Sequence, residues 1–379
     1  MKVPEIMFAL SGGAWRVRRC WPQLSSTEPL KVTRITVEAT PIHGERSHRY
    51  AAQLCFEPAQ PEETLWLRLN PYGYDAALPT LVEHLQRALQ DDPGAAVVAH
   101  RWGKRAVIRS AQGFIKVVRP GSAAALVQRQ ACAERYYGEH AVLAALLRQE
   151  DDGAVITAPL VGRTLAELGN DPSLGDAELA GHWQAFGNMM RCCCRELSAD
   201  WGGLPQHGLE AEQRIVDDWL IRMMLSEQVS SNCALELHQR SRQLCSRLAA
   251  RGAAPLSLLH RDLHDKQVLF TPQGPALLDF DTLALGDAAL DLGNVLAHLR
   301  LRACQHAWRN KPEPAHSFNR FRQARRALLN GWAPDDAMMA RAELFAELSW
   351  IRLLGVYLWR PAWRKMAQKW AQDNDYQGM

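Results

Sequence analysis

Four polar side chains with catalytic potential lie close together in the C-terminal half of the sequence: Asp262, Gln267, Asp279 and Asp281. A carboxylate such as Asp262 can accept the proton of an attacking hydroxyl group. Amide and carboxylate oxygens such as those of Gln267 and Asp279 can hold Mg²⁺ against nucleotide phosphates. This combination favours phosphoryl transfer. Asp281 is either a further metal ligand or a hydrogen-bond partner of the loop.

The residues between them predict the element that brings them together. Two short apolar runs, 268–270 and 276–278, flank the segment Thr271-Pro272-Gln273-Gly274, which has the composition of a tight turn. We therefore expect a β-hairpin. Because hairpin strands are antiparallel, Gln267 and Asp279 should lie at the same end, beside the loop that carries Asp262.

The spacing matches a known catalytic loop. His260-Arg261-Asp262 with an amide five residues after the aspartate fits the kinase pattern, and Asp279-Phe280 fits the start of its metal-binding motif. The string resembles the aminoglycoside phosphotransferase and choline kinase superfamily, whose loop often has histidine at the position of His264. Gln267 departs from the usual asparagine, although maltose kinases, which resemble this superfamily, also have glutamine there.

The resemblance covers roughly residues 95–300 and implies a bilobal, kinase-like α+β fold. It implies ATP and Mg²⁺ as cofactors, with Asp262 as the catalytic base and Gln267, Asp279 and Asp281 as metal ligands. The acceptor would be a hydroxyl group of an aminoglycoside, sugar, amino alcohol or similar metabolite. His260 and Asp291 are expected to have structural roles, because a loop that buries backbone polar groups needs side chains to satisfy them.

A lysine on a predicted strand is the candidate phosphate ligand. Alternation places Lys116 on one face of the third of three strands, which we expect at 95–99, 105–109 and 114–118. In kinase-like lobes such a lysine is braced by a glutamate from the next helix. Glu139 is the candidate, because apolar residues three, four and seven positions later put it on the inward face of a helix. The alternative is an exposed lysine and a surface glutamate.

The resemblance also suggests where adenine would bind. Residues 155–159 form a short extended piece that leads into Gly162-Arg163-Thr164-Leu165, a string similar to those that follow the hinge in the superfamily. The backbone of Ile156, Thr157 and Ala158 would then hydrogen-bond adenine. Arg101-Trp102-Gly103-Lys104 is the corresponding nucleotide-covering turn, although a plain hairpin is an equal alternative.

We expect three regions along the chain: an N-terminal α+β extension at 1–92, a nucleotide-binding lobe at 93–158 and a helical lobe at 159–379. In the extension, residues 31–40, 50–56 and 65–69 have strand-like composition, and residues 78–89 have helical spacing. After Asp281 a new helix is expected almost at once, which leaves no room for a protein-kinase activation segment. A small-molecule acceptor is therefore favoured over a protein.

The composition of the chain argues against several other classes of protein. The 379 residues carry a formal charge of only +3, which gives no footprint of nucleic-acid binding. The nine cysteines form no Cys-x-x-Cys pair, and no apolar run reaches the roughly 18 residues of a membrane span. We expect a cytoplasmic protein.

The arginine-rich segment 300–326 is expected to be a solvated helical face, with an anionic acceptor or a membrane surface as the alternative. Gln267 leaves a nucleotide-binding regulatory pseudokinase as the alternative function.

Overall fold

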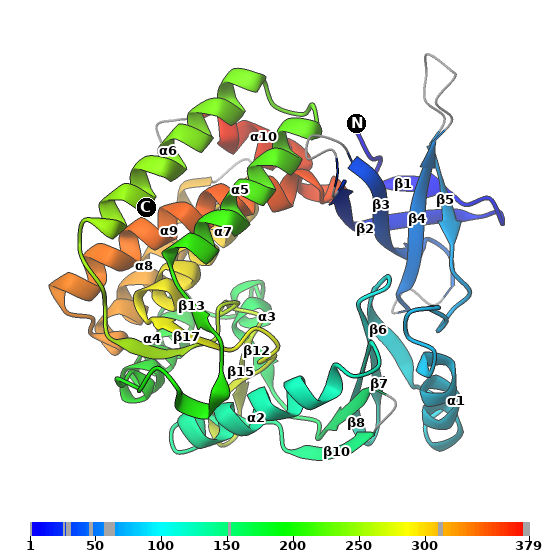
Figure 1. Cartoon of the computed structure of the whole chain (residues 1–379), viewed down its shortest axis with the longest axis horizontal. Helices are drawn as coiled ribbons and strands as arrows, with labels where there is room; N and C mark the ends of the chain where they lie inside the picture. The colour runs from blue at the N-terminus through cyan, green and yellow to red at the C-terminus, as the bar shows by residue number, and fades with distance from the viewer. Residues whose placement is uncertain are drawn as a thin grey trace.

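The computed structural model has two β-rich parts and one large helical part, arranged as a ring of elements (Figure 1). It describes residues 2–25, 27, 32–44, 48–56, 65–150, 153–309 and 314–373. The kinase-like α+β fold class inferred from the sequence is confirmed. Within the described residues, no helix has the length and apolar content needed to cross a membrane.

The N-terminal part is an antiparallel sheet with its strands in sequence order. Its members are β1 (Ile6–Phe8), β2 (Ala14–Leu24), β3 (Val32–Pro41), β4 (Tyr50–Phe56) and β5 (Leu65–Leu69). A bridge between Ala9 and Leu67 brings the first strand back to the last, so the sheet is strongly curved. The three strands expected in this region are present. β1 and β2 were not predicted. In β2, the arginines at 16, 18 and 19 interrupt the apolar residues that would indicate a strand.

The second part is a sheet in the order β10-β11-β8-β7-β6. Its strands are β6 (Ala96–Arg101), β7 (Arg105–Ser110), β8 (Gly113–Val118), β10 (Leu146–Glu150) and β11 (Ala154–Thr157), with helix α2 (Ala123–Tyr137) beside it. The three strands expected between residues 95 and 118 are confirmed. Helix α1 (Leu81–Asp91) packs Leu81 and Leu85 against Val97 and Ile108 of this sheet. The helix at the end of the predicted extension thus shares the core of the nucleotide lobe, and the boundary at residue 92 stays a prediction.

The helical part begins after residue 159 and contains one large core. Its helices are α3 (Leu165–Gly169), α4 (Asp176–Cys193), α5 (Leu209–Leu225), α6 (Ser231–Ala249), α7 (Ala289–Arg309), α8 (Pro314–Trp332), α9 (Asp336–Leu358) and α10 (Arg364–Gln372), with 3₁₀ turns at Trp201–Gly203 (η1) and Pro361–Trp363 (η2). Thr164 caps α3, since its hydroxyl accepts a hydrogen bond from the Glu167 amide at 3.1 Å.

Short strands join the helices to the catalytic loop. One sheet has the order β12-β15-β16-β9, and another the order β13-β17-β14. Their strands are β9 (Val142–Leu143), β12 (Arg163–Thr164), β13 (Gln206–His207), β14 (Leu256–Leu259), β15 (Val268–Thr271), β16 (Gly274–Leu277) and β17 (Ala284–Asp287).

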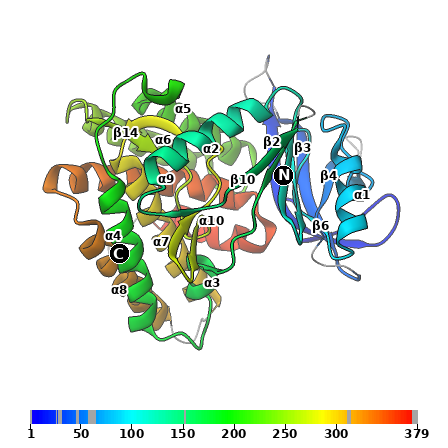
Figure 2. The same ribbon diagram turned by 90° about the horizontal axis from the view of Figure 1, so that it is seen from below.

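The N-terminal sheet reaches across the molecule and docks on the C-terminal helices. The Cys20 amide of β2 donates to the Trp359 carbonyl at 3.1 Å, directly after α9. The Arg222 Nε of α5 donates to the Pro22 carbonyl at 3.1 Å. These contacts between the N-terminal sheet and the C-terminal helices close the ring of elements in Figure 1. Figure 2 shows the helical part on one side and the N-terminal sheet with α1 on the other.

Candidate active site

The predicted hairpin is present as β15 and β16, which pair antiparallel with Val268 opposite Leu277. At its open end the Leu278 amide donates to the Gln267 carbonyl at 3.0 Å, and the Gln267 amide donates to the His264 carbonyl at 2.8 Å. Gln267 and the residue before Asp279 are thus bonded to each other. This is the arrangement expected from the sequence.

Buried side chains hold the loop that carries Asp262. The Asp291 carboxylate of α7 accepts hydrogen bonds from the amides of His260 at 2.7 Å and Arg261 at 2.8 Å. His260 Nε2 bonds the Leu278 carbonyl at 2.8 Å. Burial raises the pKa of Asp291, although these hydrogen bonds favour its charged form. The structural roles expected for His260 and Asp291 are therefore confirmed.

Two carboxylates after the hairpin converge on Lys116 of β8. Lys116 Nζ lies 2.9 Å from Asp279 Oδ1 and 2.5 Å from Asp281 Oδ1. Arg105 of β7 also bonds Asp281 and lies 3.7 Å from Asp279 Oδ2. Asp279 has φ +63°, a left-handed conformation that is costly for a residue with a Cβ and is often retained at functional sites.

These ion pairs control the charge of the cluster. Burial raises the pKa of the Asp279 carboxyl, but Lys116 and Arg105 outweigh burial and leave the pKa well below its usual value. Burial likewise lowers the pKa of the Lys116 ammonium, and Asp279 and Asp281 reverse that effect. The Asp279 carboxyl and the Lys116 ammonium are therefore both charged near neutral pH.

Asp262, Asp279 and Asp281 line one cleft of about 610 Å³ between the two lobes. The Asp262 side chain is half exposed to this cleft. Gln267 is not among the described residues that line it, so its role as a metal ligand stays a prediction that rests on the position of its backbone.

A histidine pair lies beneath the catalytic loop. His264 stacks on His298 of α7 with ring centroids 4.4 Å apart, and its Nε2 lies 3.8 Å from Asp262 Oδ1. Burial lowers the pKa of His264 to about 4. Asp265 accepts two hydrogen bonds from the guanidinium of Arg302, at 2.6 and 2.9 Å. These contacts tie the loop to α7.

Glu139, the partner expected for Lys116, does not lie on a helix as predicted. Helix α2 ends at Tyr137, and Glu139 lies in an exposed turn after it. The apolar residues that follow form strands β9 and β10, because they pair with β16 and β11 instead of continuing the helix. In place of a glutamate, α2 directs Arg129 towards the cleft.

The adenine-binding segment differs in part from expectation. Ile156 and Thr157 belong to β11, which pairs with β10 on one side and β8 on the other. The Ala158 amide, expected to serve adenine, already donates to the Ala145 carbonyl at 2.9 Å. The Gly103 amide of the covering turn donates to Asp75 Oδ2 at 2.7 Å. In this structure both amides are therefore occupied by protein acceptors.

Sequence reasoning missed most of the positive charge around the carboxylates. The basic residues that line the cleft are Arg101, Lys104, Arg105, Arg119 and Arg129. They come from the β6–β7 hairpin, the end of β8 and α2. Arg101 and Lys104 belong to the turn that was predicted to cover the nucleotide. Arg119 and Arg129 had no motif to identify them, and only the fold brings them to the cleft.

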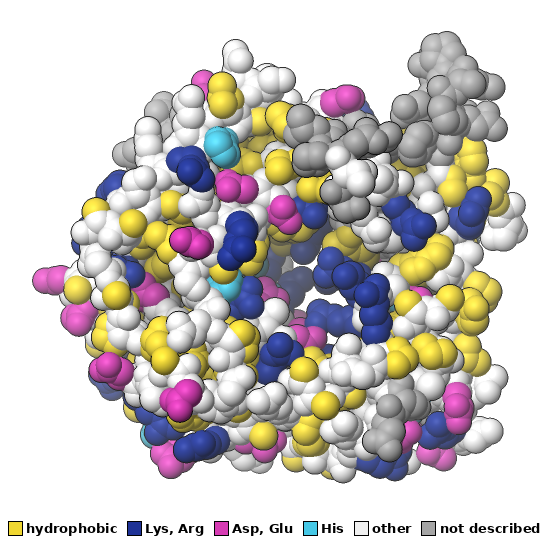
Figure 3. All heavy atoms as spheres, in the orientation of Figure 1, with side chains coloured by type: hydrophobic (Ala, Val, Ile, Leu, Met, Phe, Trp, Pro, Cys, Tyr) yellow, Lys and Arg dark blue, Asp and Glu magenta, His cyan; other side chains and the backbone are white. Residues whose placement is uncertain are grey.

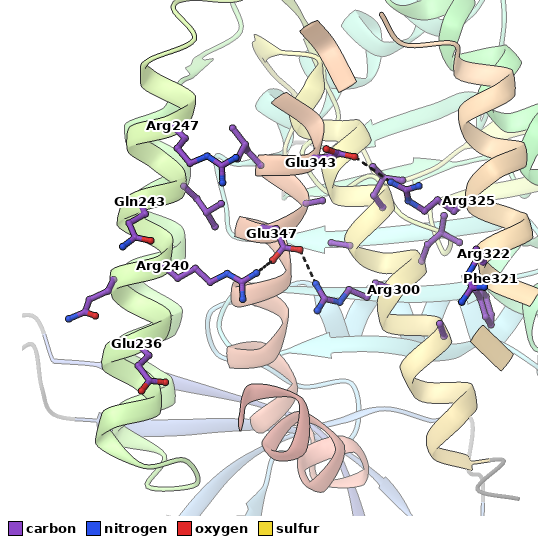
Figure 4. A pocket seen from close by; sticks show the side chains of 18 residues that line it. Glu236, Arg240, Gln243, Arg247, Arg300, Phe321, Arg322, Arg325, Glu343 and Glu347 are labelled. Atoms are coloured by element: carbon purple, nitrogen blue, oxygen red, sulfur yellow. Dashed lines mark hydrogen bonds and ion pairs between the residues drawn. The ribbon is translucent and has the colours of Figure 1, made fainter. Parts of the chain in front are cut away.

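The arginine-rich segment is only in part the solvated face that was expected. Arg309, Arg322 and Arg326 are exposed, whereas Arg302 is buried against Asp265 and Arg320 bonds Asp176 at 2.5 Å. Arg300 bonds Glu347 at 3.0 Å inside a second cavity, of about 810 Å³, enclosed by α6, α7, α8 and α9 (Figure 4). Arg300 and Arg320 therefore join neighbouring helices through ion pairs, and Arg302 joins α7 to the catalytic loop.

Several solved structures are similar to this chain. No curated protein sequence matches the chain. Among solved structures, aminoglycoside phosphotransferase APH(3'')-Id of Streptomyces rimosus is 20% identical over 72% of this chain and 98% of its own, with a TM-score of 0.49. A glucosamine kinase is 17% identical over 95% and 94%, with a TM-score of 0.48. A choline/ethanolamine kinase family protein of Mesorhizobium loti is 15% identical over 76% and 93%, with a TM-score of 0.49.

The family comparison is decisive. Residues 114–337, more than half of the 379 residues, match the phosphotransferase enzyme family. The matched segment contains the predicted catalytic loop, the hairpin and both aspartates that bond Lys116. The superfamily inferred from these motifs, and the expectation of a phosphotransferase, are confirmed. The chain belongs to the phosphotransferase enzyme family.

Proposed function

We propose that the protein transfers the γ-phosphoryl group of ATP to a hydroxyl group of a small molecule, with Asp262 as the catalytic base. The observation that carries this proposal is the convergence of Asp262, Asp279 and Asp281 in one cleft, with Lys116 bonded to the last two. A cytoplasmic location, where ATP is available, belongs to the same proposal.

Each side chain has a specific task in this reaction. Asp262 accepts the proton of the acceptor hydroxyl and orients its oxygen, and its half-exposed carboxylate leaves room for an acceptor. Lys116 and Arg105 bind phosphate oxygens, so they exchange their bonds to Asp279 and Asp281 for bonds to the nucleotide. The hydrogen bonds of Asp291 keep the loop rigid while this exchange occurs.

The donor set fits Mg²⁺. Asp279 and Asp281 present carboxylate oxygens to the same ammonium group, and such hard oxygens are the ligands that Mg²⁺ prefers. Gln267 is the third proposed ligand, supported by its backbone bond beside Asp279. When bound, the ion supplies neutralisation of the charge that develops on the phosphate oxygens.

The test is ATP turnover in the presence of Mg²⁺ and a panel of hydroxyl acceptors. Asp262→Asn should reduce kcat by about 10²–10⁴-fold, the usual contribution of a general base, while calorimetry shows nearly unchanged nucleotide binding. Asp218→Asn is the matched control, because Asp218 is an exposed residue of α5. Turnover by Asp262→Asn within threefold of the wild type would contradict the assigned base. Nucleotide binding without transfer to any acceptor would favour the regulatory pseudokinase.

A further inference from the structure

A second group of cations lies near Asp262, on elements that do not belong to the nucleotide lobe. It consists of Arg19 on β2, Lys266 in the catalytic loop and Arg360 directly after α9, and we call these residues the distal cations. Arg360 interacts electrostatically with Asp262 and with Arg19, and Lys266 interacts with Arg19. Asp262 also interacts with Arg105 of the nucleotide lobe. Asp262 is thus exposed to the charge of two groups of cations.

The backbone fixes two of the distal cations beside each other. The Cys20 amide bonds the Trp359 carbonyl at 3.1 Å, so the backbones of the adjacent residues Arg19 and Arg360 lie close together, and their guanidinium groups interact electrostatically. Two guanidinium groups repel each other, and a protein that fixes them together loses stability unless an anion joins them. Placement of this kind is typical of an anion site.

Carboxylates of the protein do not cancel these charges. Within the described residues, Lys266 and Arg360 have no carboxylate within ion-pair distance. Arg19 lies 3.8 Å from Glu38, whose carboxylate also lies 4.0 Å from Arg49. The nearby Asp265 is already bound by two nitrogens of Arg302. The distal cations therefore keep a net positive charge.

The pKa of Tyr357 of α9 reflects the positive charge around it. The Arg360 guanidinium stacks on its ring at 4.3 Å, and Arg360 Nη1 lies 3.1 Å from its hydroxyl group. Burial would raise the pKa of Tyr357, but Arg360, Arg302 and Lys266 outweigh burial and lower it. Lysine and arginine side chains are visible around the hollow in Figure 3.

The distal cations are separate from those that face the nucleotide phosphates. Lys116 and Arg105 already supply positive charge at Asp279 and Asp281. An acceptor must place its hydroxyl group at Asp262, whose carboxylate interacts electrostatically with Arg360. The rest of a bound acceptor is therefore exposed to the positive charge of the distal cations. A cationic acceptor would be repelled there, whereas an anionic group would be bound.

We propose that the acceptor is a hydroxyl compound that carries an anionic group, a carboxylate or a phosphate ester, and that Arg19, Lys266 and Arg360 bind this group. The inference rests on the proposed function, because it assigns these residues to the acceptor. It names the charge class of the acceptor, and it excludes amino sugars and amino alcohols as preferred substrates.

The experiment compares four acceptors of similar size with the full chain: glucose, glucosamine, glucuronate and glucose 6-phosphate. We expect kcat/KM for glucuronate or glucose 6-phosphate to exceed the other two at least tenfold. Comparison of the two anions distinguishes a carboxylate from a phosphate ester. Equal or better turnover of glucosamine or glucose would overturn the inference while leaving the kinase function intact.

Variants assign the preference to the distal cations. Arg19→Gln and Arg360→Gln should each raise KM for the preferred anion about tenfold, which corresponds to ~1.4 kcal/mol, with KM for ATP changed less than twofold. Arg360→Lys should retain part of the preference. Lys365→Gln, at an exposed position of α10, is the control and should change neither value. An unchanged KM for the anion in Arg19→Gln would overturn the assignment even if the Arg360 variants fail to fold.

Binding separates failure of the inference from failure of the proposed function. If no acceptor is phosphorylated, calorimetry with a non-hydrolysable ATP analogue measures whether glucuronate or glucose 6-phosphate binds. Binding that Arg19→Gln weakens would support the anion site and count against transfer. Absence of binding by both anions would overturn the anion site.

Discussion

The active-site cleft and the cavity between α6, α7, α8 and α9 have the same charge composition. Each is lined by five basic side chains and three carboxylates. In the cavity, Glu347 of α9 bonds Arg240 of α6 and Arg300 of α7, so the charges join neighbouring helices (Figure 4). In the cleft, Asp262 lies in the loop before a tight hairpin and the other two carboxylates follow the hairpin, one of which, Asp279, has a left-handed backbone. The content of charged residues does not identify a catalytic site, whereas backbone conformation and the loops that carry the carboxylates do.

The strongest test of this comparison is Asp279→Asn. It keeps the shape of the side chain but removes the charge that the cleft supplies to a metal and to Lys116. We expect kcat to fall about 10²–10³-fold, the scale seen when one preorganised electrostatic contact is removed. Steady-state kinetics at saturating Mg²⁺ measure the loss. Activity within tenfold of the wild type would show that the cleft carboxylates are no more functional than those of the cavity.

The next largest effect concerns acid stability of the catalytic loop. The pKa of His264 is about 4, against about 6.5 in an unfolded chain, so the unfolded state binds a proton first as the pH falls. His264 therefore costs no stability above pH 6.5, and by pH 4 it should cost about 3 kcal/mol.

Urea unfolding between pH 7 and 4 measures that effect. His264→Gln should lose less stability over this interval than the wild type. His316→Gln is the control, because the side chain of His316 is 66% exposed. Parallel stability curves for the wild type and His264→Gln would refute the assignment.

A smaller effect is expected for Gln267→Asn. The shorter amide matches the loop of the family more closely, and the backbone bonds of residue 267 with His264 and Leu278 do not depend on its side chain. We expect kcat/KM for Mg-ATP to change less than about tenfold, or ~1.4 kcal/mol. Gln267→Leu, which lacks an amide oxygen, should reduce it further. Equal activity of the leucine variant would remove Gln267 from the set of metal ligands.

The smallest effect on activity belongs to the cavity. Glu347→Gln breaks ion pairs with Arg240 and Arg300, which are partly exposed, so the free energy of unfolding should fall by only about 1 kcal/mol. Activity should stay within twofold of the wild type. Glu343→Gln is the milder control, since its pair with Arg325 is 3.7 Å long and largely exposed. A large loss of activity in Glu347→Gln would give the cavity a functional role.

The catalytic hairpin was predictable because its signals are local. Thr271 to Gly274 set the turn, and the turn fixes which residues meet at the open end. Glu139 was misplaced because apolar residues at helical spacing can equally form two short strands. Tertiary pairing of Val142 and Leu143 with β16 decided between them.

The positive charge around Asp262 was not predictable for a related reason. Arg19, Arg129 and Arg360 each lie more than 100 residues from the next, in segments without a motif. Only the docking of β2 beside Trp359 and the packing of α2 bring them to one place. Sequence reasoning found the residues that one hairpin organises, and it missed those that three separate parts of the chain contribute.

The docking of β2 on the C-terminal helices also has a mechanical consequence. Two lobes joined by a single covalent hinge can rotate about that hinge as rigid bodies. Here the lobes are attached a second time, through Cys20 with Trp359 and Arg222 with Pro22. Wide opening of the lobes must therefore either break these two hydrogen bonds or bend the N-terminal sheet.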